Sequence, residues 1–244
     1  MIEMNEYGRT ADEKIYLENR YEEPKEMMKQ IAQLLELNTN KYSSKNFSLL
    51  DIGTATGEFL YYIRKINKEI QLDGIEYSDK LVNHAKLFLS KHDISCRQGD
   101  ANNLNTVADK SYDFVTTLGV TSIFDDFRPS FAEMIRVAKD EARCINTMLV
   151  NEYEIDVLIK YKTQSGIGFE SGWNKFSITS INKFLTQNER VKKVEFIKHT
   201  LPFDLPQRDD LLRSWTRVDN DGNRILWNGL NMEITGYHIC FDLK

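Results

Sequence analysis

The residues best suited to bind a ligand lie in a loop between a predicted strand and a predicted helix. Gly53 and Gly57 stand four positions apart in Asp51–Phe59, which reads DIGTATGEF, and Ala55 lies between them. Glycine permits a tight turn and lets a ligand approach the backbone closely. A dinucleotide fingerprint places its first and last glycines five positions apart, so this spacing indicates a different ligand.

Two carboxylates follow at the ends of the next two predicted strands. Glu76 ends one strand, where a carboxylate can accept hydrogen bonds from both hydroxyl groups of a ribose. Asp100 follows the other strand, where it can accept a hydrogen bond from the amino group of an adenine. Together with the glycine loop, these acids indicate a ligand that contains a nucleoside.

The elements expected to position these residues alternate between strands and helices. Apolar runs predict strands at 47–52, 70–77, 94–97, 112–118, 143–150, 191–199 and 232–243. Apolar residues at helical spacing predict helices at 24–37, 57–67, 78–89, 129–139 and 178–188. The alternation from 47 to 150 implies a parallel sheet with helices on both faces, and ligands of such sheets bind beyond the carboxyl ends of the strands.

These residues resemble the motifs of class I S-adenosylmethionine-dependent methyltransferases. In that family the glycine loop holds the methionine part of the cofactor, the acid after the second strand binds the ribose, and the Asp after the third strand meets the adenine. The resemblance implies S-adenosyl-L-methionine as cofactor and assigns its binding to the matching or adjacent positions Asp51, Gly53, Ala55, Gly57, Glu76, Tyr77, Asp100, Ala101 and Leu118. Tyr112–Val115 matches the fourth motif, and Ala55 replaces the middle glycine of the loop.

The same resemblance implies the fold and the division of the chain. We expect an α/β fold with a doubly wound, seven-stranded, mostly parallel sheet, the Rossmann-like methyltransferase fold, whose last strand is antiparallel. A single methyltransferase domain over 1–244 would comprise an N-terminal helical cap at 1–40, a cofactor-binding core at 45–150 and substrate-side insertions at 151–176 and 201–228. Aromatic residues outside the core lead us to expect that Tyr7–Tyr21 and 161–176 close over the site and exclude water.

Composition and charge restrict the partners. Hydrophobic residues make up 41% of the chain and charged residues 28%, and the net charge of −5 disfavours a nucleic-acid partner. The sequence has no apolar run of the length that a transmembrane helix needs and no signal peptide, so we expect a cytoplasmic protein with no membrane partner. The three cysteines are far apart and predict neither a disulfide framework nor a metal site. The oligomeric state stays open.

Several classes of methyl acceptor are disfavoured by missing motifs. Amino-methyltransferases of adenine and cytosine resemble one another in an Asp/Asn-Pro-Pro-aromatic motif after the fourth strand, where this chain reads Leu118-Gly119-Val120-Thr121. The Pro-Cys pair of cytosine C5 enzymes is absent. Metal-dependent catechol-type enzymes carry an Asp directly at the end of that strand, whereas Asp125 and Asp126 come later and are expected to begin the next helix. O- or N-methylation of a small molecule remains.

The C-terminal part of the chain suggests the kind of small molecule. Residues 213–229 loosely resemble methyltransferases of bacterial surface-polysaccharide pathways, which implies a sugar, a sugar nucleotide or a phosphorylated precursor. Four arginines are suited to bind an anionic group of that acceptor: Arg208, Arg213, Arg217 and Arg224. Two alternatives stay open, a methyltransferase for a protein or RNA group and a cofactor-binding subunit with no chemistry of its own.

An alcohol acceptor would gain from a general base, whereas an anionic phosphate-type oxygen would not. His199 comes at the end of the strand predicted near 191–199, directly after Lys198, and Glu152 follows the strand predicted at 143–150, so both would lie at carboxyl ends. The pKa of histidine suits this task near neutrality. We therefore predict His199 first and Glu152 second as catalytic residues, and expect His84 and His238 to be structural.

Overall fold

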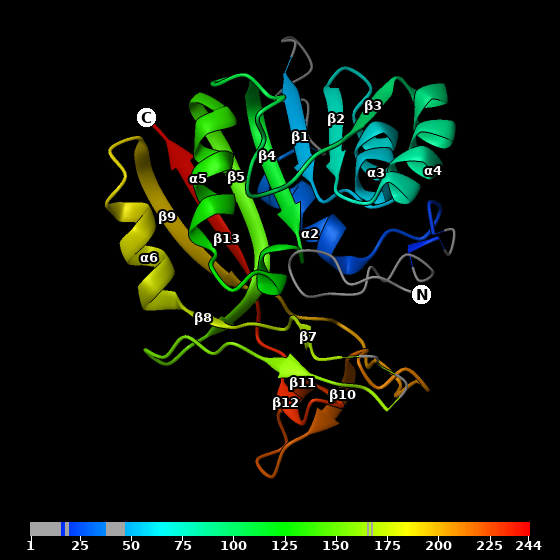
Figure 1. Cartoon of the computed structure of the whole chain (residues 1–244), viewed down its shortest axis with the longest axis vertical. Helices are drawn as coiled ribbons and strands as arrows, with labels where there is room; N and C mark the ends of the chain where they lie inside the picture. Colours follow the sequence, from blue (N-terminus) through cyan, green and yellow to red (C-terminus); the bar gives the residue numbers. More distant parts are fainter. Residues whose placement is uncertain (1–15, 18–19, 38–46, 165, 167) are drawn as a thin grey trace.

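The computed structural model describes residues 16–17, 20–37, 47–164, 166 and 168–244 (Figure 1). Its main sheet has the strand order β3-β2-β1-β4-β5-β13-β9, and one further short strand, β8, pairs with β5. The strands are β1 (Ser48–Ile52), β2 (Gln71–Glu76), β3 (Ile94–Gln98), β4 (Tyr112–Leu118), β5 (Ala138–Asn151), β8 (Phe176–Ser177), β9 (Val191–Lys198) and β13 (Gly236–Leu243).

The strand directions confirm the predicted fold class. Strands β3, β2, β1, β4 and β5 run parallel, and β13 is antiparallel to both of its neighbours, β5 and β9. The order reverses between β1 and β4, which is where a doubly wound sheet opens its ligand crevice. The sheet is therefore the mostly parallel, Rossmann-like sheet with an antiparallel last strand.

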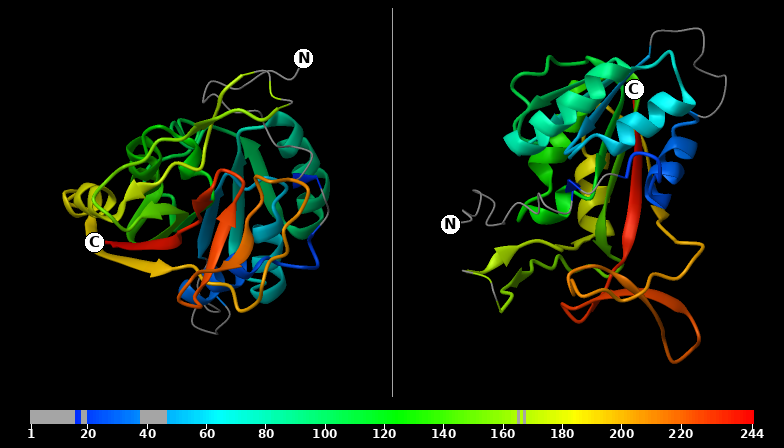
Figure 2. Two further views of the ribbon diagram at one scale, coloured as in Figure 1. Left: turned by 90° about the horizontal axis from the view of Figure 1, so that it is seen from below. Right: turned by 90° about the vertical axis from the view of Figure 1, so that its right-hand side faces the viewer.

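Helices cover both faces of the sheet, because each presents an apolar stripe to it. The α-helices are α2 (Glu26–Leu34), α3 (Glu58–Ile66), α4 (Asp79–Leu89), α5 (Arg128–Val137) and α6 (Ile178–Thr186), and the short 3₁₀ helices are η2 (Ser90–His92) and η3 (Thr121–Ile123). Helices α2, α3 and α4 enclose one apolar core, and α5 and α6 enclose the other. The right-hand view of Figure 2 shows α2 and α5 on opposite sides of the sheet.

Local signals explain where two of these helices begin. The hydroxyl of Ser78 accepts a hydrogen bond from the backbone N–H of Leu81 at 3.3 Å, so Ser78 caps α4. Pro129 lies in the first turn of α5, where its missing N–H costs nothing. These starts fix the loops that precede each helix at the carboxyl edge of the sheet.

Two insertions extend beyond the carboxyl ends of the strands (Figure 1). The first contains the paired strands β6 (Lys160–Tyr161) and β7 (Glu170–Ser171). The second forms a separate three-stranded sheet of β10 (Trp215–Val218), β11 (Arg224–Asn228) and β12 (Met232–Glu233). The strands β10 and β11 are joined by a turn in which Gly222 has a φ of 84°, and the sequence did not predict these two strands.

Two predicted boundaries were wrong. The strand expected over 232–243 is divided, because the chain pairs with β11 through β12 and only then enters the main sheet as β13. Strand β5 begins at Ala138 rather than at 143, directly after α5, with an irregular register against β4 and a φ of 62° at Glu141.

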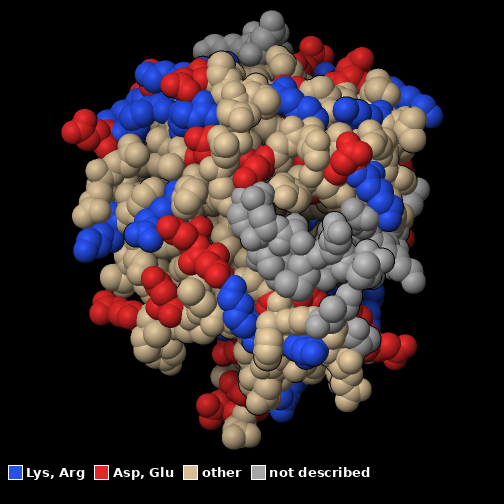
Figure 3. All heavy atoms as spheres, in the orientation of Figure 1, with Lys and Arg blue, Asp and Glu red and all other residues tan. Residues whose placement is uncertain are grey.

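Lysine and arginine side chains alternate with aspartate and glutamate over the described surface drawn in Figure 3. No helix among the described residues is both long enough and apolar enough to span a membrane.

Candidate cofactor and acceptor site

The glycine loop crosses the carboxyl end of β2 in a conformation that requires glycine at two positions. Gly53 has a φ of 72° and Gly57 a φ of 83°. A Cβ on Gly53 would lie 2.2 Å from Cγ2 of Val120, and one on Gly57 would lie 2.3 Å from Cδ1 of Leu89. The backbone N–H of Gly53 donates to the carbonyl of Ile75 at 2.7 Å, which ties the loop to β2.

Glu76 holds both the loop and the start of α4. Its Oε2 accepts a hydrogen bond from the backbone N–H of Ala55 at 2.9 Å, and its Oε1 accepts one from the backbone N–H of Ser78 at 2.9 Å. Ala55 adopts a left-handed φ of 51° although it is not glycine, so the loop keeps the conformation that the absent middle glycine would favour. The carboxylate therefore lies at the edge of the loop, where the resemblance places the ribose.

Asp51 supports the loop from within the sheet. It is 2% exposed, and its Oδ1 accepts a hydrogen bond from the hydroxyl of Thr116 at 2.8 Å. Burial raises the pKa of Asp51 to about 7, because the charged form loses its hydration, and the charge of nearby Glu76 contributes to this rise.

The remaining predicted cofactor residues lie at the same edge. Oδ1 of Asp100 accepts a hydrogen bond from the backbone N–H of Asn102 at 2.9 Å, which shapes the turn after β3. Tyr77 is 39% exposed at the end of β2, and Ala101 is buried beside Asp100. After Leu118, Gly119 has a φ of 75°, and a Cβ there would meet no atom of the described residues within 4 Å.

This arrangement fits S-adenosyl-L-methionine. The glycine loop, Glu76 and Asp100 follow three neighbouring strands, in the order that the methionine, ribose and adenine parts require. The carboxyl end of β4 lies at the switch point of the sheet, where a ligand of this fold class binds. The residues that would hold the cofactor are therefore present together at one edge.

Part of the N-terminal segment packs on the glycine loop. The ring of Tyr21 stacks on Phe88 with centroids 3.8 Å apart, and its hydroxyl donates to the carbonyl of Thr56 at 2.8 Å. The hydroxyl of Thr56 in turn donates to the carbonyl of Tyr16 at 3.3 Å. Most of the predicted closing segment Tyr7–Tyr21 lies outside the described residues.

Asp125 fastens the first insertion to the loop after β4. Its carboxylate accepts hydrogen bonds from Nζ of Lys160 at 2.7 and 2.9 Å, and from the hydroxyl of Ser171 at 2.9 Å. The fully buried Asn174 adds a bond from its Nδ2 to the carbonyl of Phe124 at 2.7 Å. The expectation that Asp125 begins the next helix was therefore wrong.

Asp126 does lie at that helix start. Its Oδ1 accepts a hydrogen bond from the backbone N–H of Arg128, the first residue of α5, at 3.0 Å. Sequence spacing alone did not separate the two neighbouring acids, because both precede the apolar stripe of α5. Their different roles depend on a segment more than thirty positions further along the chain.

The two predicted bases lie beyond the carboxyl ends of their strands but in different surroundings. Glu152 accepts hydrogen bonds from the hydroxyl of Tyr237 at 2.5 Å and from Nζ of Lys198 at 3.0 Å. Both bonds lower the pKa of Glu152, which makes it a weaker base. His199 is half-buried, and burial lowers its pKa, so its imidazole is neutral near pH 7.

His199 is hydrogen-bonded to a residue that the sequence analysis did not select. Nδ1 of His199 lies 2.7 Å from Oε1 of Gln30 on α2, and the same oxygen lies 2.9 Å from Nε2 of His238 on β13. The sequence did contain a signal that could have identified Gln30. It is a polar residue within the apolar stripe of α2, three positions after Met27 and four before Leu34.

The four arginines proposed for an anion lie in or before the small sheet. Nη2 of Arg224 is 2.7 Å from Asp204, and Nε of Arg213 is 3.3 Å from Asp210. The guanidinium of Arg217 lies 4.8 Å from the ring centre of Trp227. Arg208 is exposed.

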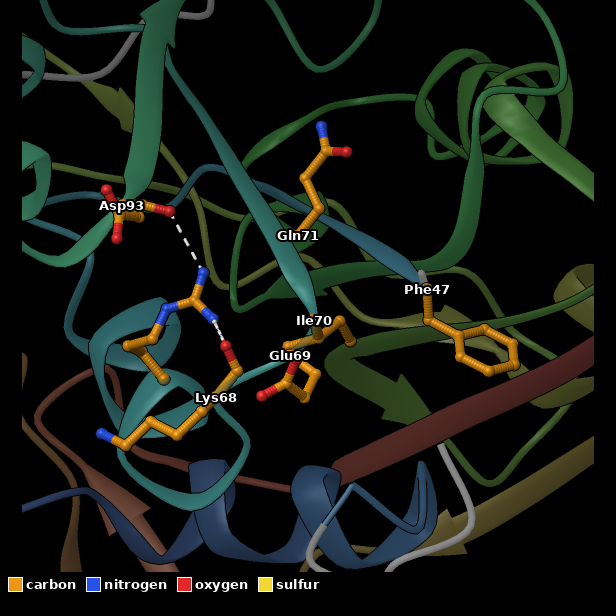
Figure 4. A pocket seen from close by; sticks show the side chains of 7 residues that line it. Phe47, Lys68, Glu69, Ile70, Gln71 and Asp93 are labelled. Atoms are coloured by element: carbon orange, nitrogen blue, oxygen red, sulfur yellow. Dashed lines mark hydrogen bonds between the residues drawn. The ribbon is translucent and has the colours of Figure 1, made fainter. Parts of the chain in front are cut away.

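A separate pocket of about 380 Å³ lies at the opposite, amino-terminal ends of β1 and β2 (Figure 4). Arg64 beside it donates to the backbone carbonyls of Lys68 at 2.7 Å and Asp93 at 3.1 Å. The pocket is lined by Phe47, Arg64, Lys68, Glu69, Ile70, Gln71 and Asp93. None of the predicted site residues lines it.

The comparisons with known proteins agree with this geometry. Residues 50–146 match a family model described as a methyltransferase domain. That range contains the glycine loop, Glu76, Asp100 and the end of β4. The chain thus carries a methyltransferase domain, and S-adenosyl-L-methionine is the cofactor of that domain, as predicted. A search of the curated proteins finds no match.

Solved structures share the fold at low identity. The PH0226 protein of Pyrococcus horikoshii is 15% identical with a TM-score of 0.57, over 95% of this chain and 99% of that one. A Haloferax volcanii protein solved in complex with a methyltransferase activator is 15% identical with a TM-score of 0.57, over 95% and 96%. The [4+2]-cyclase SpnF is 20% identical with a TM-score of 0.51, over 67% and 60%. The fold alone therefore does not define the reaction.

Proposed function

We propose that this methyltransferase methylates an oxygen of a small polar molecule, such as a sugar, a sugar nucleotide or a phosphorylated precursor of a surface polysaccharide. The observation that carries the proposal is the small sheet beyond the carboxyl ends of the main strands. Trp215 and Trp227 are cross-strand partners on it, and Arg217 stacks on Trp227. Aromatic rings beside a guanidinium suit a polar acceptor with an anionic group.

The cofactor residues support the first half of the reaction. When bound, S-adenosyl-L-methionine supplies an electrophilic methyl group on a positively charged sulfur and leaves as S-adenosylhomocysteine. The glycine loop, Glu76 and Asp100 hold the cofactor at the carboxyl edge. The acceptor oxygen is aligned with the methyl carbon by the insertions, so proximity supplies much of the rate.

We further propose His199 as the general base for an alcohol acceptor. It is neutral near pH 7, and it follows β9 at the carboxyl edge. Glu152 is the weaker candidate, because Tyr237 and Lys198 already occupy its carboxylate and lower its pKa. The cytoplasm is the proposed compartment, which suits three buried, free cysteines.

The test is methyl transfer from radiolabelled S-adenosylmethionine to a panel of free hexoses, sugar phosphates and nucleoside diphosphate sugars. Total RNA and a protein extract are offered as alternative acceptors. We expect label in one of the sugar compounds. Label only in RNA or protein would overturn the proposed acceptor class. Cofactor binding without transfer to any of them would instead support a subunit without chemistry of its own.

The base is tested with His199→Gln, which keeps a polar side chain but removes the imidazole. Turnover should fall about 10²-fold or more while S-adenosylhomocysteine affinity stays unchanged. His84→Gln on α4 is the matched control and should retain turnover. Unchanged turnover of His199→Gln from pH 6 to 9 would remove His199 and indicate an acceptor oxygen that is already anionic.

A further inference from the structure

A continuous row of hydrogen bonds connects His199 to β5, β13 and α2. The hydroxyl of Thr147 on β5 is 2.8 Å from Nδ1 of His238, and Nε2 of His238 is 2.9 Å from Oε1 of Gln30. Nδ1 of His199 is 2.7 Å from the same Oε1. Nε2 of Gln30 donates to the backbone carbonyl of Thr200 at 2.8 Å.

The last of these bonds fixes the direction of the others. The carbonyl of Thr200 can only accept, so it orients the NH₂ group of Gln30 toward itself and the amide oxygen toward both imidazoles. An amide oxygen also only accepts, so Nδ1 of His199 and Nε2 of His238 must each carry a proton. Nδ1 of His238 then accepts from the hydroxyl of Thr147. Each described hydrogen bond in the row has one donor and one acceptor.

We propose that Gln30 is a positioning residue for His199, because its side-chain oxygen holds the proton on Nδ1 and thereby presents Nε2 as the basic atom. The inference rests on the proposed function of His199 as the base. A neutral imidazole has one N–H, so the nitrogen that does not face Gln30 is the one with a free lone pair. Without an acceptor at Nδ1, the imidazole would distribute its proton between both nitrogens.

The surroundings keep this imidazole neutral and in place. Burial lowers the pKa of His199, and Glu26 on α2 opposes that shift. Burial also lowers the pKa of His238 to about 4, so His238 is neutral at physiological pH. The ring of His199 lies over Gly236. A Cβ built on Gly236 would lie 3.7 Å from Cδ2 of His199. Helix α2 on one side and β13 on the other thus limit how the ring can turn.

The proton balance of the step is simple. The hydroxyl proton of the acceptor goes to Nε2 of His199, while the oxygen's electron pair forms the new bond to the methyl carbon and the sulfur retains the pair of the broken bond. His199 then carries protons on both nitrogens, and Gln30 continues to accept from Nδ1. The imidazolium returns its extra proton to water after the product leaves.

The tautomer can be measured without any acceptor. Long-range ¹H–¹⁵N correlation spectra distinguish the two nitrogens of an imidazole, and the chain has only four histidines. We expect His199 of the wild type to be protonated on Nδ1 at pH 7.5. Gln30→Met, which keeps the length but removes the oxygen, should move a substantial part of that proton to Nε2. Gln33→Met, at an exposed position on the same helix, is the control and should leave the spectrum unchanged.

Gln30→Glu provides the conservative comparison. A carboxylate still accepts from Nδ1, so the tautomer should be retained, while its charge raises the pKa of His199. Because the base must be neutral, the rise of turnover with pH should then move to higher pH. With the best acceptor of the sugar panel, Gln30→Met should lose about tenfold in kcat or more at unchanged S-adenosylhomocysteine affinity.

The results separate this inference from the proposed function. An unchanged His199 tautomer in folded Gln30→Met would overturn the positioning role. So would a changed tautomer with full turnover, if His199→Gln is inactive. If His199→Gln itself keeps full turnover, the base and the positioning role that rests on it both fail. Transfer to a sugar compound would then still stand.

Discussion

At the scale of single residues, Gly53 is the position where the loop geometry is most restrictive. Gly53 has a left-handed backbone, and a Cβ there would lie 2.2 Å from Val120. Gly222 has a similar φ of 84°, but a Cβ there would meet no described atom within 4 Å. Gly222→Ala should therefore cost about 1 kcal/mol of unfolding free energy and leave cofactor binding intact. Gly53→Ala should cost more and weaken S-adenosylhomocysteine binding at least tenfold. Thermal unfolding and calorimetry measure both, and equal effects of the two variants would contradict the account.

The buried Asp51 predicts an unusual pH dependence of stability. Its pKa of about 7 in the folded state lies above the value of about 3.9 in an unfolded chain. The folded state thus binds more protons between these values, so its stability falls as the pH rises from 4 to 7. Asparagine does not titrate, so Asp51→Asn should not lose stability in this way. The unfolding free energy of the variant minus that of the wild type should therefore increase by up to about 4 kcal/mol from pH 4 to pH 8.

Urea unfolding at several pH values tests this prediction, and Asp113→Asn is the control of opposite sign. Hydrogen bonds from Lys139 and Ser48 lower the pKa of Asp113, so this carboxylate stabilises the fold above pH 4 and loses that contribution as the pH falls. A stability difference between Asp51→Asn and the wild type that does not change with pH would contradict the raised pKa.

The sequence predicted which residues gather at the cofactor edge, but not how they hold one another. Gly53 and Glu76 carry short-range signals, a turn and a strand end. The bond from Glu76 to the N–H of Ala55 and the bond from Tyr21 to the carbonyl of Thr56 join positions far apart in the chain. Such contacts depend on how strands and helices pack, which local spacing does not contain.

At the scale of elements, Asp125 predicts how the first insertion is attached. Asp125→Ala removes the acceptor for Lys160 and Ser171, so hydrogen exchange over 157–175 should become faster. Asp126→Ala is the matched control, because that side chain contacts Arg128 instead. The tether should persist at a lower pH than an ordinary aspartate would allow, since the hydrogen bond from Lys160 lowers the pKa of Asp125. Equal exchange in the two variants would show that Asp125 does not hold the insertion.

The predicted closing segments can be tested in the same way. We expect hydrogen exchange at 7–21 and 161–176 to slow when S-adenosylhomocysteine is added. Tyr21→Phe keeps the ring on Phe88 but loses the bond to Thr56, so cofactor affinity should fall by about 1 kcal/mol. Tyr61→Phe, which loses an exposed bond to Glu22, should have no such effect. Absence of protection in both segments would reject the closure.

Helices and strands were predicted correctly where apolar residues recur regularly over several turns. The prediction failed where a strand is defined by its pairing with a distant part of the chain. The apolar spacing of α3 and α4 is regular, and both helices were predicted correctly. Strands β10 and β11 are half-exposed and pair through a polar turn, so their sequences show no continuous apolar pattern. The break between β12 and β13 follows from pairing with two different sheets, which the run 232–243 does not reveal.

At the scale of the whole molecule, the parallel sheet brings separate segments to one edge. The predicted cofactor residues lie at or after the ends of β1, β2, β3 and β4, and the loops after β5 and β9 carry Glu152 and His199. Both insertions extend from the same edge (Figure 1), while the pocket of Figure 4 lies at the other end. We therefore expect cofactor and acceptor to meet between the sheet edge and the insertions.

Calorimetric titration of the wild type with S-adenosylhomocysteine tests this account most directly, because it requires no knowledge of the acceptor. We expect a dissociation constant in the micromolar range, which corresponds to about −8 kcal/mol. Glu76→Ala should weaken binding by about 1.5–3 kcal/mol, since a charge-assisted hydrogen bond is lost. Asp79→Ala, which removes a carboxylate that accepts from Asn83 on α4, should leave binding unchanged. No heat with either S-adenosylhomocysteine or S-adenosylmethionine, from a folded protein, would contradict the assignment of the site.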